Sequence, residues 1–380
     1  MNHLPFDSEL LARTIDTWHA AHPGMGLLAL VPEAEKDRVP LLQQICRGRG
    51  IALSGALFPA LVASGGFTCQ GVWLLPLEAG TPSVLIPDID ADAEHTAMRI
   101  AEAVGQGLSA PVLAGGTPIL YMIFDGLIGN IASILDALYL RLADRVEYAG
   151  VNAGSETFQP MPCLFDADRV IGGGVLAVLL PGACRTVVGH GYPVPERVMT
   201  ATSTDGNRVQ SIDWRPAFEV YREIIGEEYG IALTRENFYA YAVHFPFGIL
   251  RAEDDVVVRI PVALADDGSL MCIGEVPEQA MLALLRAPPP DADRCIGRLA
   301  EALGGGRQAL RGRDLLVFYC AGRRMHFGDA ALDELGALQA RTGAAAVGGA
   351  LSLGEIGSTS AWGYPMFHNA ALVCTPWQPA

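Results

Sequence analysis

The residues best suited to chemistry stand near the C-terminus, where one acid interrupts a segment of small and apolar residues. Glu355 is the only charged residue between Val347 and Gly357, a segment of sequence VGGALSLGEIG, and His368 and Asn369 follow it. Glycines within a strand let backbone or ligand approach closely. Glu355 is therefore a candidate contact for a ligand amine or a water molecule. The alternative is a buried acid that only fixes the fold.

Neighbouring residues extend this candidate site. Gly354 precedes the acid, and a polar loop with Ser358, Thr359 and Ser360 follows it. Hydroxyl groups both donate and accept hydrogen bonds. Together with the carboxylate they suit a small polar metabolite.

Four of the eight histidines lie next to apolar runs and are candidates for holding a haem iron. A haem pocket needs an apolar cavity and an axial ligand, usually a histidine nitrogen. His190 stands between two glycines at a strand end, which leaves room for a flat macrocycle, and a solvated loop histidine is the alternative. His244 precedes Phe245-Pro246-Phe247, an aromatic wall suited to porphyrin, although a core histidine bonded to backbone explains it as well. The other two are His326 and His368.

Motifs of known catalytic machinery are missing from the sequence. It holds no G-x-S-x-G turn, no Walker lysine motif, no H-E-x-x-H and no Cys/His set with zinc spacing. The run Gly172-Gly173-Gly174 lacks the fingerprint and the helix of a dinucleotide site. We therefore expect a binding protein rather than an enzyme.

Composition limits the class of partner. The chain has 380 residues, of which 51% are hydrophobic and 18% charged, so it is a globular protein with room for two or three domains. The formal net charge of −16 argues against nucleic acid and against an anionic membrane surface, because both repel an acidic protein.

Sequence features that bear on location point to the cytoplasm. The chain lacks an uninterrupted apolar run of roughly 20 residues, the length that a membrane helix needs. The first residues include Asp7 and Glu9 and lack the apolar core of a signal peptide. The eight cysteines show no CxxC spacing and lie mostly in apolar runs, which favours buried thiols over disulfides. We expect a soluble cytoplasmic protein.

A strand–helix–strand–strand order occurs three times along the chain. After an amphipathic helix in residues 1–24, each unit begins with a buried strand, continues with a helix, and ends with a small-residue strand and a returning strand. Similar glycine-rich segments, Ala149 to Glu156 and Val347 to Glu355, favour internal duplication over coincidence. We expect an α+β fold with mixed sheets covered by helices. The strands are expected at residues 25–31, 51–57, 68–77, 118–124, 146–156, 170–180, 314–320, 347–357 and 370–374, the last ended by Pro376.

The region between the second and third units has a different character. Residues 200–210 are polar and predict a linker, and residues 213–225 predict a helix. Strands are expected at 256–260 and 269–275, joined by a turn at Asp266-Asp267-Gly268.

These segments together resemble the FIST family of bacterial sensory proteins over nearly the whole chain. The first half departs from the family where Ala56-Leu57-Phe58-Pro59 replaces a polar, glycine-rich loop start. The resemblance rests on the strand with Gly55, Ala149 to Ser155, His190-Gly191-Tyr192-Pro193, Phe245-Pro246-Phe247-Gly248, Val258-Arg259-Ile260-Pro261, Gly274-Glu275-Val276-Pro277, Cys320 with Arg323, Gly354-Glu355-Ile356-Gly357 and His368-Asn369.

The resemblance implies a FIST N-terminal domain at 25–208, a FIST C-terminal domain at 209–380, and a cytoplasmic sensor of small ligands. Its haem-binding members imply a non-covalent haem b that senses nitric oxide and signals to a separate histidine kinase or cyclic-di-GMP enzyme, with a homodimer left open. The haem iron is then expected on His190, or alternatively on His244. Tyr192, Phe245, His368 and Arg323 are expected beside the cofactor, with Arg323 and Arg324 able to hold its propionates.

The alternative is a sensor of an amino-acid-like metabolite without haem. The resemblance then points to Arg259 as a partner for such a ligand, beside Glu355, Gly354, Asn369 and Ser358. It also names Arg259 and Arg323 as candidate ion-pair partners for a buried Glu355.

Overall fold

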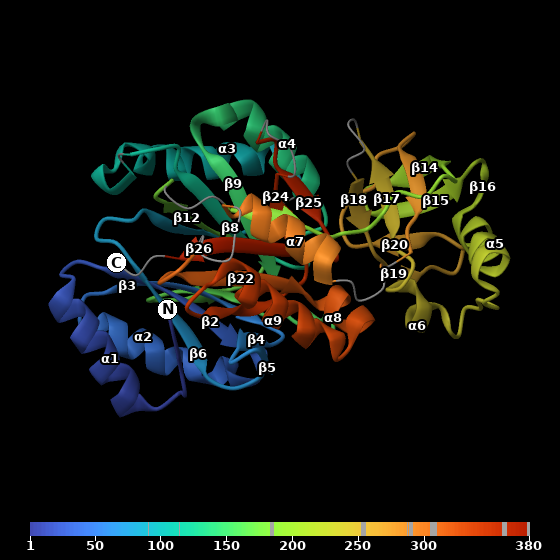
Figure 1. Ribbon diagram of the computed structural model, residues 1–380. Helices are drawn as coiled ribbons and strands as arrows, with labels where there is room; N and C mark the ends of the chain where they lie inside the picture. Colours follow the sequence, from blue (N-terminus) through green and yellow to red (C-terminus); the bar gives the residue numbers. More distant parts are fainter. Residues whose placement is uncertain are drawn as a thin grey trace.

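The computed structural model consists of two units that differ in size (Figure 1). It describes residues 1–89, 91–113, 115–182, 186–251, 256–286, 288, 292–304, 310–358 and 363–377. We call residues 199–285 the small unit, and the described residues before and after it the large unit. The large unit holds three six-stranded sheets and the small unit one eight-stranded sheet. The predicted α+β fold with mixed sheets is confirmed.

The large unit is built from three copies of one strand arrangement. In each copy a first strand pairs in parallel with a second and antiparallel with a third. The third copy comes from the C-terminal end of the chain. The predicted repeat is therefore present. The strands are β2 (Gly26–Pro32), β3 (Ala52–Phe58) and β6 (Val72–Leu77); β8 (Ile119–Asp125), β9 (Glu147–Ala153) and β12 (Val175–Leu180); and β22 (Asp314–Cys320), β23 (Val347–Ser352) and β26 (Leu372–Trp377).

The three copies exchange strands in a closed ring. The free side of each second strand takes an antiparallel strand from another copy: β10 (Leu164–Asp166) of the second copy pairs with β3, β24 (Glu355–Gly357) of the third with β9, and β4 (Leu61–Ala63) of the first with β23. Segments far apart in sequence thus share sheets. The division at residue 208 stays a prediction, and the C-terminal strands pack in space with the first half of the chain.

A glycine occupies the same register in each second strand. Gly55 pairs with Ala29, Gly150 with Met122 and Gly349 with Val317. A Cβ atom on these glycines would lie 2.7, 2.0 and 1.9 Å from the carbonyl oxygen of the paired residue. Only glycine fits there, because real Cβ atoms do not approach backbone oxygen so closely. The similarity between the two glycine-rich segments thus reflects equivalent positions in the fold.

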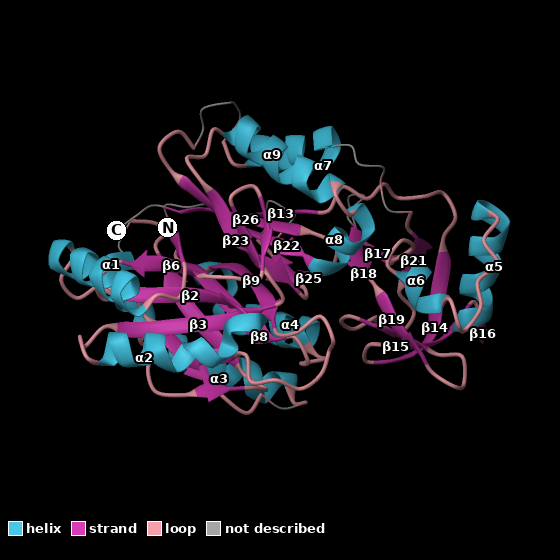
Figure 2. Ribbon diagram, turned by 90° about the horizontal axis from the view of Figure 1, so that it is seen from below, coloured by secondary structure: helices cyan, strands magenta, loops and turns pink. Residues whose placement is uncertain are grey.

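Helices cover the outer faces of the three copies, and their inner faces meet in one core. The Phe318 ring of the third copy contacts Phe58 of the first and Tyr121 of the second, with ring centroids 5.4 and 6.1 Å apart. Figure 2 shows α7 and α9 on the opposite side of the large unit from α2 and α3. The helices of the large unit are α1 (Ser8–Ala21), α2 (Val39–Arg47), α3 (Ala93–Gly105), α4 (Ile131–Leu142), α7 (Ala292–Ala302), α8 (Ala321–Phe327) and α9 (Ala330–Thr342).

Short elements complete the large unit. The strand β13 (Val187–Gly189) pairs with β26. The predicted end of the last strand at Pro376 is wrong: β26 continues to Trp377, and Pro376 stays in register with Leu315 of β22. The remaining strands are β1 (Asn2–Leu4), β5 (Gly66–Thr68), β7 (Ser83–Ile86), β11 (Val170–Ile171) and β25 (Met366–His368), and short 3-10 helices span Glu33–Arg38, Gly107–Ser109, Pro111–Leu113 and Ala143–Arg145.

The small unit corrects two predictions. Residues 200–210 are no linker but a hairpin of β14 (Met199–Asp205) and β15 (Arg208–Ile212), because its apolar residues pack into the core of this unit. The helix predicted at 213–225 lies later, since a tight turn at Asp213 and Trp214 precedes it. The other elements are β16 (Arg215–Pro216), α5 (Ala217–Tyr229), α6 (Phe238–Ala242), β17 (Phe247–Leu250), β18 (Val256–Arg259), β19 (Pro261–Leu264), β20 (Leu270–Cys272) and β21 (Met281–Leu284).

Helix length and cysteine state complete the description. None of the helices within the described residues is both long and apolar enough to cross a membrane. The seven cysteines in the described part of the chain are free thiols, and of these only Cys69 is exposed. The predicted buried thiols are confirmed for these residues.

Candidate functional site

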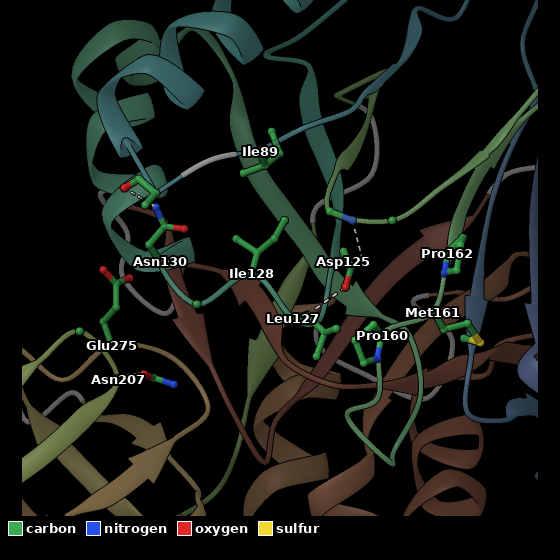
Figure 3. Close-up of a pocket in the computed structure, with 15 residues that line it drawn as sticks. Ile89, Asp125, Leu127, Ile128, Asn130, Pro160, Met161, Pro162, Asn207 and Glu275 are labelled. Carbon is green, nitrogen blue, oxygen red and sulfur yellow. Dashed lines mark hydrogen bonds between the residues drawn. The ribbon is translucent and has the colours of Figure 1, made fainter.

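A cavity of about 660 Å³ lies between the two units. One wall comes from the large unit, at the loop after β8 and the start of α4. The opposite wall comes from the small unit, at the turn between β14 and β15 and the loop after β20 (Figure 3). Its lining residues are Ile89, Ala91, Asp125, Leu127, Ile128, Gly129, Asn130, Pro160, Met161, Pro162, Gly172, Gly173, Gly206, Asn207 and Glu275.

Asp125 is the buried acid of this cavity. It ends strand β8 and is only 4% exposed. Its carboxylate accepts the backbone N–H of Gly173 at 2.7 Å and that of Leu127 at 3.0 Å (Figure 3). The Cys163 side chain is a third hydrogen-bond partner. A carboxylate offers about four acceptor positions, so these bonds leave capacity for a ligand donor.

Glu275 supplies the second acid and joins the units across the cavity. Its carboxylate accepts the backbone N–H of Ser133 at 3.0 Å and also the Ser133 hydroxyl. Ser133 lies in the first turn of α4, whose N-cap residue Asn130 forms no side-chain bond to its own helix and instead donates to Ala91 O at 3.1 Å. The acid of one unit thus caps a helix of the other, where a negative charge is favourable.

The remaining walls are apolar, apart from two amides. Asn207 in the β14–β15 turn donates its Nδ2 to Cys272 O at 2.9 Å, so its Oδ1 is the acceptor end of the amide. Asn130 and Glu275 are drawn as neighbouring sticks in Figure 3, and both line the cavity. The apolar lining side chains are Ile89, Leu127, Ile128, Pro160, Met161 and Pro162. The cavity therefore combines an apolar surface with acceptor groups.

A second cavity of about 390 Å³ adjoins the first and shares Gly206 and Glu275 with it. Arg259, predicted as a ligand contact, lines it and is only 3% exposed. Its guanidinium donates to the carbonyl oxygens of Phe367 at 2.7 Å, Glu275 at 2.8 Å and Val258 at 3.1 Å. Burial lowers the pKa of Arg259 to about 10. Within the described residues it forms no ion pair.

Glu355 lies away from both cavities in a buried polar cluster. It is fully buried, accepts the Ser352 hydroxyl at 2.6 Å and accepts the backbone N–H of Ala371 at 3.2 Å. Burial raises the pKa of Glu355 to about 8. The expected ion pair with Arg259 or Arg323 is wrong, because Arg323 pairs with Glu334 instead, at 2.5 Å.

His368 and Asn369 are also fully buried within the protein. His368 is fully buried and pairs in register with Glu355, and burial lowers its pKa to about 3. The Asn369 Oδ1 accepts the backbone N–H of Ile260 at 3.0 Å, which ties the C-terminal strands to the small unit. A Cβ atom on Gly354 would lie 2.4 Å from the Phe367 ring, so this glycine serves close packing.

The predicted axial ligands are engaged with the protein. His190 Nδ1 accepts the backbone N–H of Tyr192 at 3.1 Å, so its Nε2 carries the proton and donates to Val256 O at 3.1 Å. The Nδ1 atoms of His244 and His326 are 2.6 Å apart and share a hydrogen bond.

The residues expected beside a cofactor are core residues. Tyr192 packs among apolar residues of the small unit and the C-terminal strands, and Phe245 lies in the small-unit core with its ring 4.7 Å from that of Tyr229. Ser358 is half-buried, whereas Thr359 and Ser360 lie outside the described residues.

These positions do not fit a haem as the side chains lie. No histidine is among the described residues that line the two cavities. Both ring nitrogens of His190 already have protein partners, and so does Nδ1 of His244. Ligation by His190 would need one of its two bonds to break. The haem assignment stays a prediction.

Family profiles cover most of the chain. The FIST N domain matches residues 27–215 and the FIST C domain matches residues 217–358. The chain belongs to the FIST family. FIST domains sense small ligands in signalling proteins and are sensory rather than catalytic. A search of curated proteins found no match to this FIST chain.

Sequence reasoning missed most of the cavity of this FIST protein. Neither Asp125 nor Asn130 was predicted as a site residue, and Asn207 lies in the segment predicted as a linker. The sequence did carry a signal for Asp125. It follows a predicted buried strand and so stands at the carboxyl end of that strand, which is where α/β folds bind ligands. For Asn207 we find no local signal.

Proposed function

We propose that this FIST protein is a small-ligand sensor whose ligand binds in the cavity between the large and small units. The observation that carries the proposal is that Asp125 of one unit and Glu275 of the other line the same cavity. A volume of about 660 Å³ is within the range typical of small-molecule sites.

The location supplies a route from binding to signalling. A ligand that contacts both walls stabilises the relative position of the two units in which both contacts can form. Binding therefore increases the population of molecules with the units in that position. The contact between Glu275 and Ser133 lies at this boundary, so ligand binding acts on it directly. A change in the position of the small unit is then available to a separate signalling protein.

Ligand screening with hydrogen exchange tests the proposal. Compounds that raise the melting temperature are taken into exchange measurements on the full chain. We expect protection at residues 126–133 and also at 206–207 and 273–278. Protection confined to the region of Glu355 and Ser358 would move the site there, in agreement with the sequence-based prediction.

A matched pair of variants locates the site independently. Met161→Trp fills the cavity from the large unit and should remove the ligand-induced rise in melting temperature. Glu102→Gln, on the exposed part of α3, changes the charge away from the cavity and should leave the response intact. Equal responses in both variants would exclude this cavity.

Haem b with nitric oxide as its ligand is the second candidate; it rests on the sequence-based expectation, and ligation by His190 requires one of its hydrogen bonds to break. The His190 and His368 rings are 6.3 Å apart at the boundary with the small unit. An absorption spectrum before and after adding hemin, then after reduction and exposure to nitric oxide, tests it. A sharp Soret band that shifts with nitric oxide and is lost in His190→Ala or His244→Ala supports haem. A broad spectrum that does not saturate removes it.

A further inference from the structure

We propose that the ligand of the 660 Å³ cavity is an organic cation, a primary amine carried on a small apolar body. This inference rests on the proposed function and specifies the ligand class. It follows from the sign of the charges in the cavity, the burial of one of them, and the composition of the remaining walls.

The charges in the cavity are of one sign. Its described lining residues include two carboxylates, Asp125 and Glu275, and neither lysine nor arginine. Asp125 has no ion-pair partner within the part of the chain that the structure describes. A buried carboxylate without a counter-ion attracts a cation strongly, because the local dielectric constant is lower than that of water.

Geometry leaves the acid ready for an amine. Asp125 accepts hydrogen bonds from the backbone N–H groups of Gly173 and Leu127, which fix the carboxylate in place, and the Cys163 side chain is a further hydrogen-bond partner. An ammonium group presents three donors and needs acceptors around it. Asp125, Glu275 and the amide oxygens of Asn130 and Asn207 are acceptors on both walls of the same cavity.

Apolar walls select the rest of the ligand. Ile128 and Leu127 follow Asp125 in the loop, and Met161 lies beside Pro160 and Pro162 on the other side (Figure 3). An alkyl or aryl body buries its surface here, whereas a polyhydroxylated body would lose hydrogen bonds to water.

The adjoining cavity indicates why a primary amine should bind better than an amino acid. Its arginines, Arg251 and Arg259, are absent from the lining of the larger cavity, and Glu275 stands between the two spaces. A carboxylate in the larger cavity would face two acids. A ligand that places its carboxylate at Arg259 must span both cavities past Glu275.

Three matched compounds test the ligand class. They are 3-methylbutylamine, leucine and 4-methylpentanoate, which share a branched alkyl body and differ in the amine and carboxylate groups; 2-phenylethylamine, phenylalanine and 3-phenylpropanoate repeat the comparison. Thermal-shift and calorimetric titrations use the full chain. We expect the amine of at least one series to bind at least about 10-fold more tightly than its amino acid and its acid.

Two variants assign the effect to the acids. Asp125→Asn and Glu275→Gln should each weaken amine binding by about 10- to 100-fold, the loss expected for a hydrogen bond to a charged group. Glu102→Gln should leave amine binding unchanged. Melting temperatures without ligand show whether each variant is folded, and Glu275→Gln keeps the test valid if Asp125→Asn fails to fold.

The other outcomes are distinct. Tighter binding of the amino acid or the acid overturns the cationic class but leaves the cavity as a ligand site. Absence of amine binding at millimolar concentrations in both series also overturns it. If amines bind equally to wild type, Asp125→Asn and Glu275→Gln, their site is elsewhere, and the proposed function fails along with this inference.

Discussion

Ser133 donates both its backbone N–H and its hydroxyl to the carboxylate of Glu275, a residue 142 positions later in the chain and in the other unit. The same glutamate accepts a hydrogen bond from Arg259 Nε at its carbonyl oxygen, at 2.8 Å. Glu275 is therefore fixed at both its backbone and its side chain. One residue of the small unit caps α4 and lines two cavities.

Removal of this carboxylate should loosen the boundary between the units. We expect Glu275→Ala to reduce the free energy of unfolding by about 1–2 kcal/mol, because the first turn of α4 loses its cap. Hydrogen exchange at Ser133 should increase as well. Glu278→Ala removes an exposed acid from the same loop and should change neither quantity. Equal effects of the two variants would contradict a specific role for Glu275.

The buried ion pair between Arg323 and Glu334 should be costly to break from one side. Arg323 is held by Glu334, His190 O and Ala370 O, so Arg323→Met leaves Glu334 without its counter-charge. We expect a loss of about 3–5 kcal/mol in urea unfolding. The double variant Arg323→Met with Glu334→Leu should lose less than Arg323→Met alone. A loss equal to or greater than that of the single variant would argue against this explanation.

Glu355 should make stability depend on pH. Burial raises its folded-state pKa to about 8, above the ordinary value of 4.5. Between these values the folded protein retains a proton that the unfolded chain has released, so this group's contribution to stability falls as pH rises, by about 1.4 kcal/mol per pH unit at most. It is fully present below pH 4.5 and lost as pH rises through about 8.

Glu355→Gln isolates that contribution, because the amide cannot ionise. The unfolding free energy of the variant minus that of the wild type should increase from pH 5 to pH 8. The slope of the difference is the readout, since Gln also changes the bond to Ala371 N–H. A difference that does not vary with pH would mean that Glu355 titrates normally in the folded protein.

Two glycine substitutions should differ sharply. In Gly150→Ala the new Cβ would lie 2.0 Å from Met122 O, and paired backbone cannot move without disturbing two strands. We expect a loss of more than about 3 kcal/mol. Gly336 in α9 has open space around it, so Gly336→Ala should stabilise the protein by about 0.5–1 kcal/mol. Thermal unfolding of both variants provides the measurement, and similar melting temperatures would contradict the close backbone approach.

Local patterns predicted much of the fold. The three buried first strands, the small-residue second strands and the helix at residues 8–21 could be recognised because each depends on neighbouring residues. The prediction failed at 200–210, where a polar hairpin buries only some of its residues and their burial depends on elements distant in sequence.

The candidate site was predicted only in part. Arg259 was predicted as a ligand contact and lines the second cavity, whereas Glu275 belongs to a family motif but was not predicted as a site residue. Glu355 and His368 attracted attention because they are polar residues in apolar strands. The same sequence pattern describes both a ligand contact and a buried structural group. Their full burial, with internal partners for Glu355, identifies them as part of the core.

By itself, the sequence determined the three repeated units, the acidic surface charge and membership of a sensory family, since these depend on composition, local spacing and motif order. Only the tertiary structure decided that the repeats exchange strands in a ring, and that Asp125 and Glu275 line one cavity. The physical reason is that strand pairing between remote segments fixes where loops lie. The sequence of a loop does not indicate which distant segment the loop will contact.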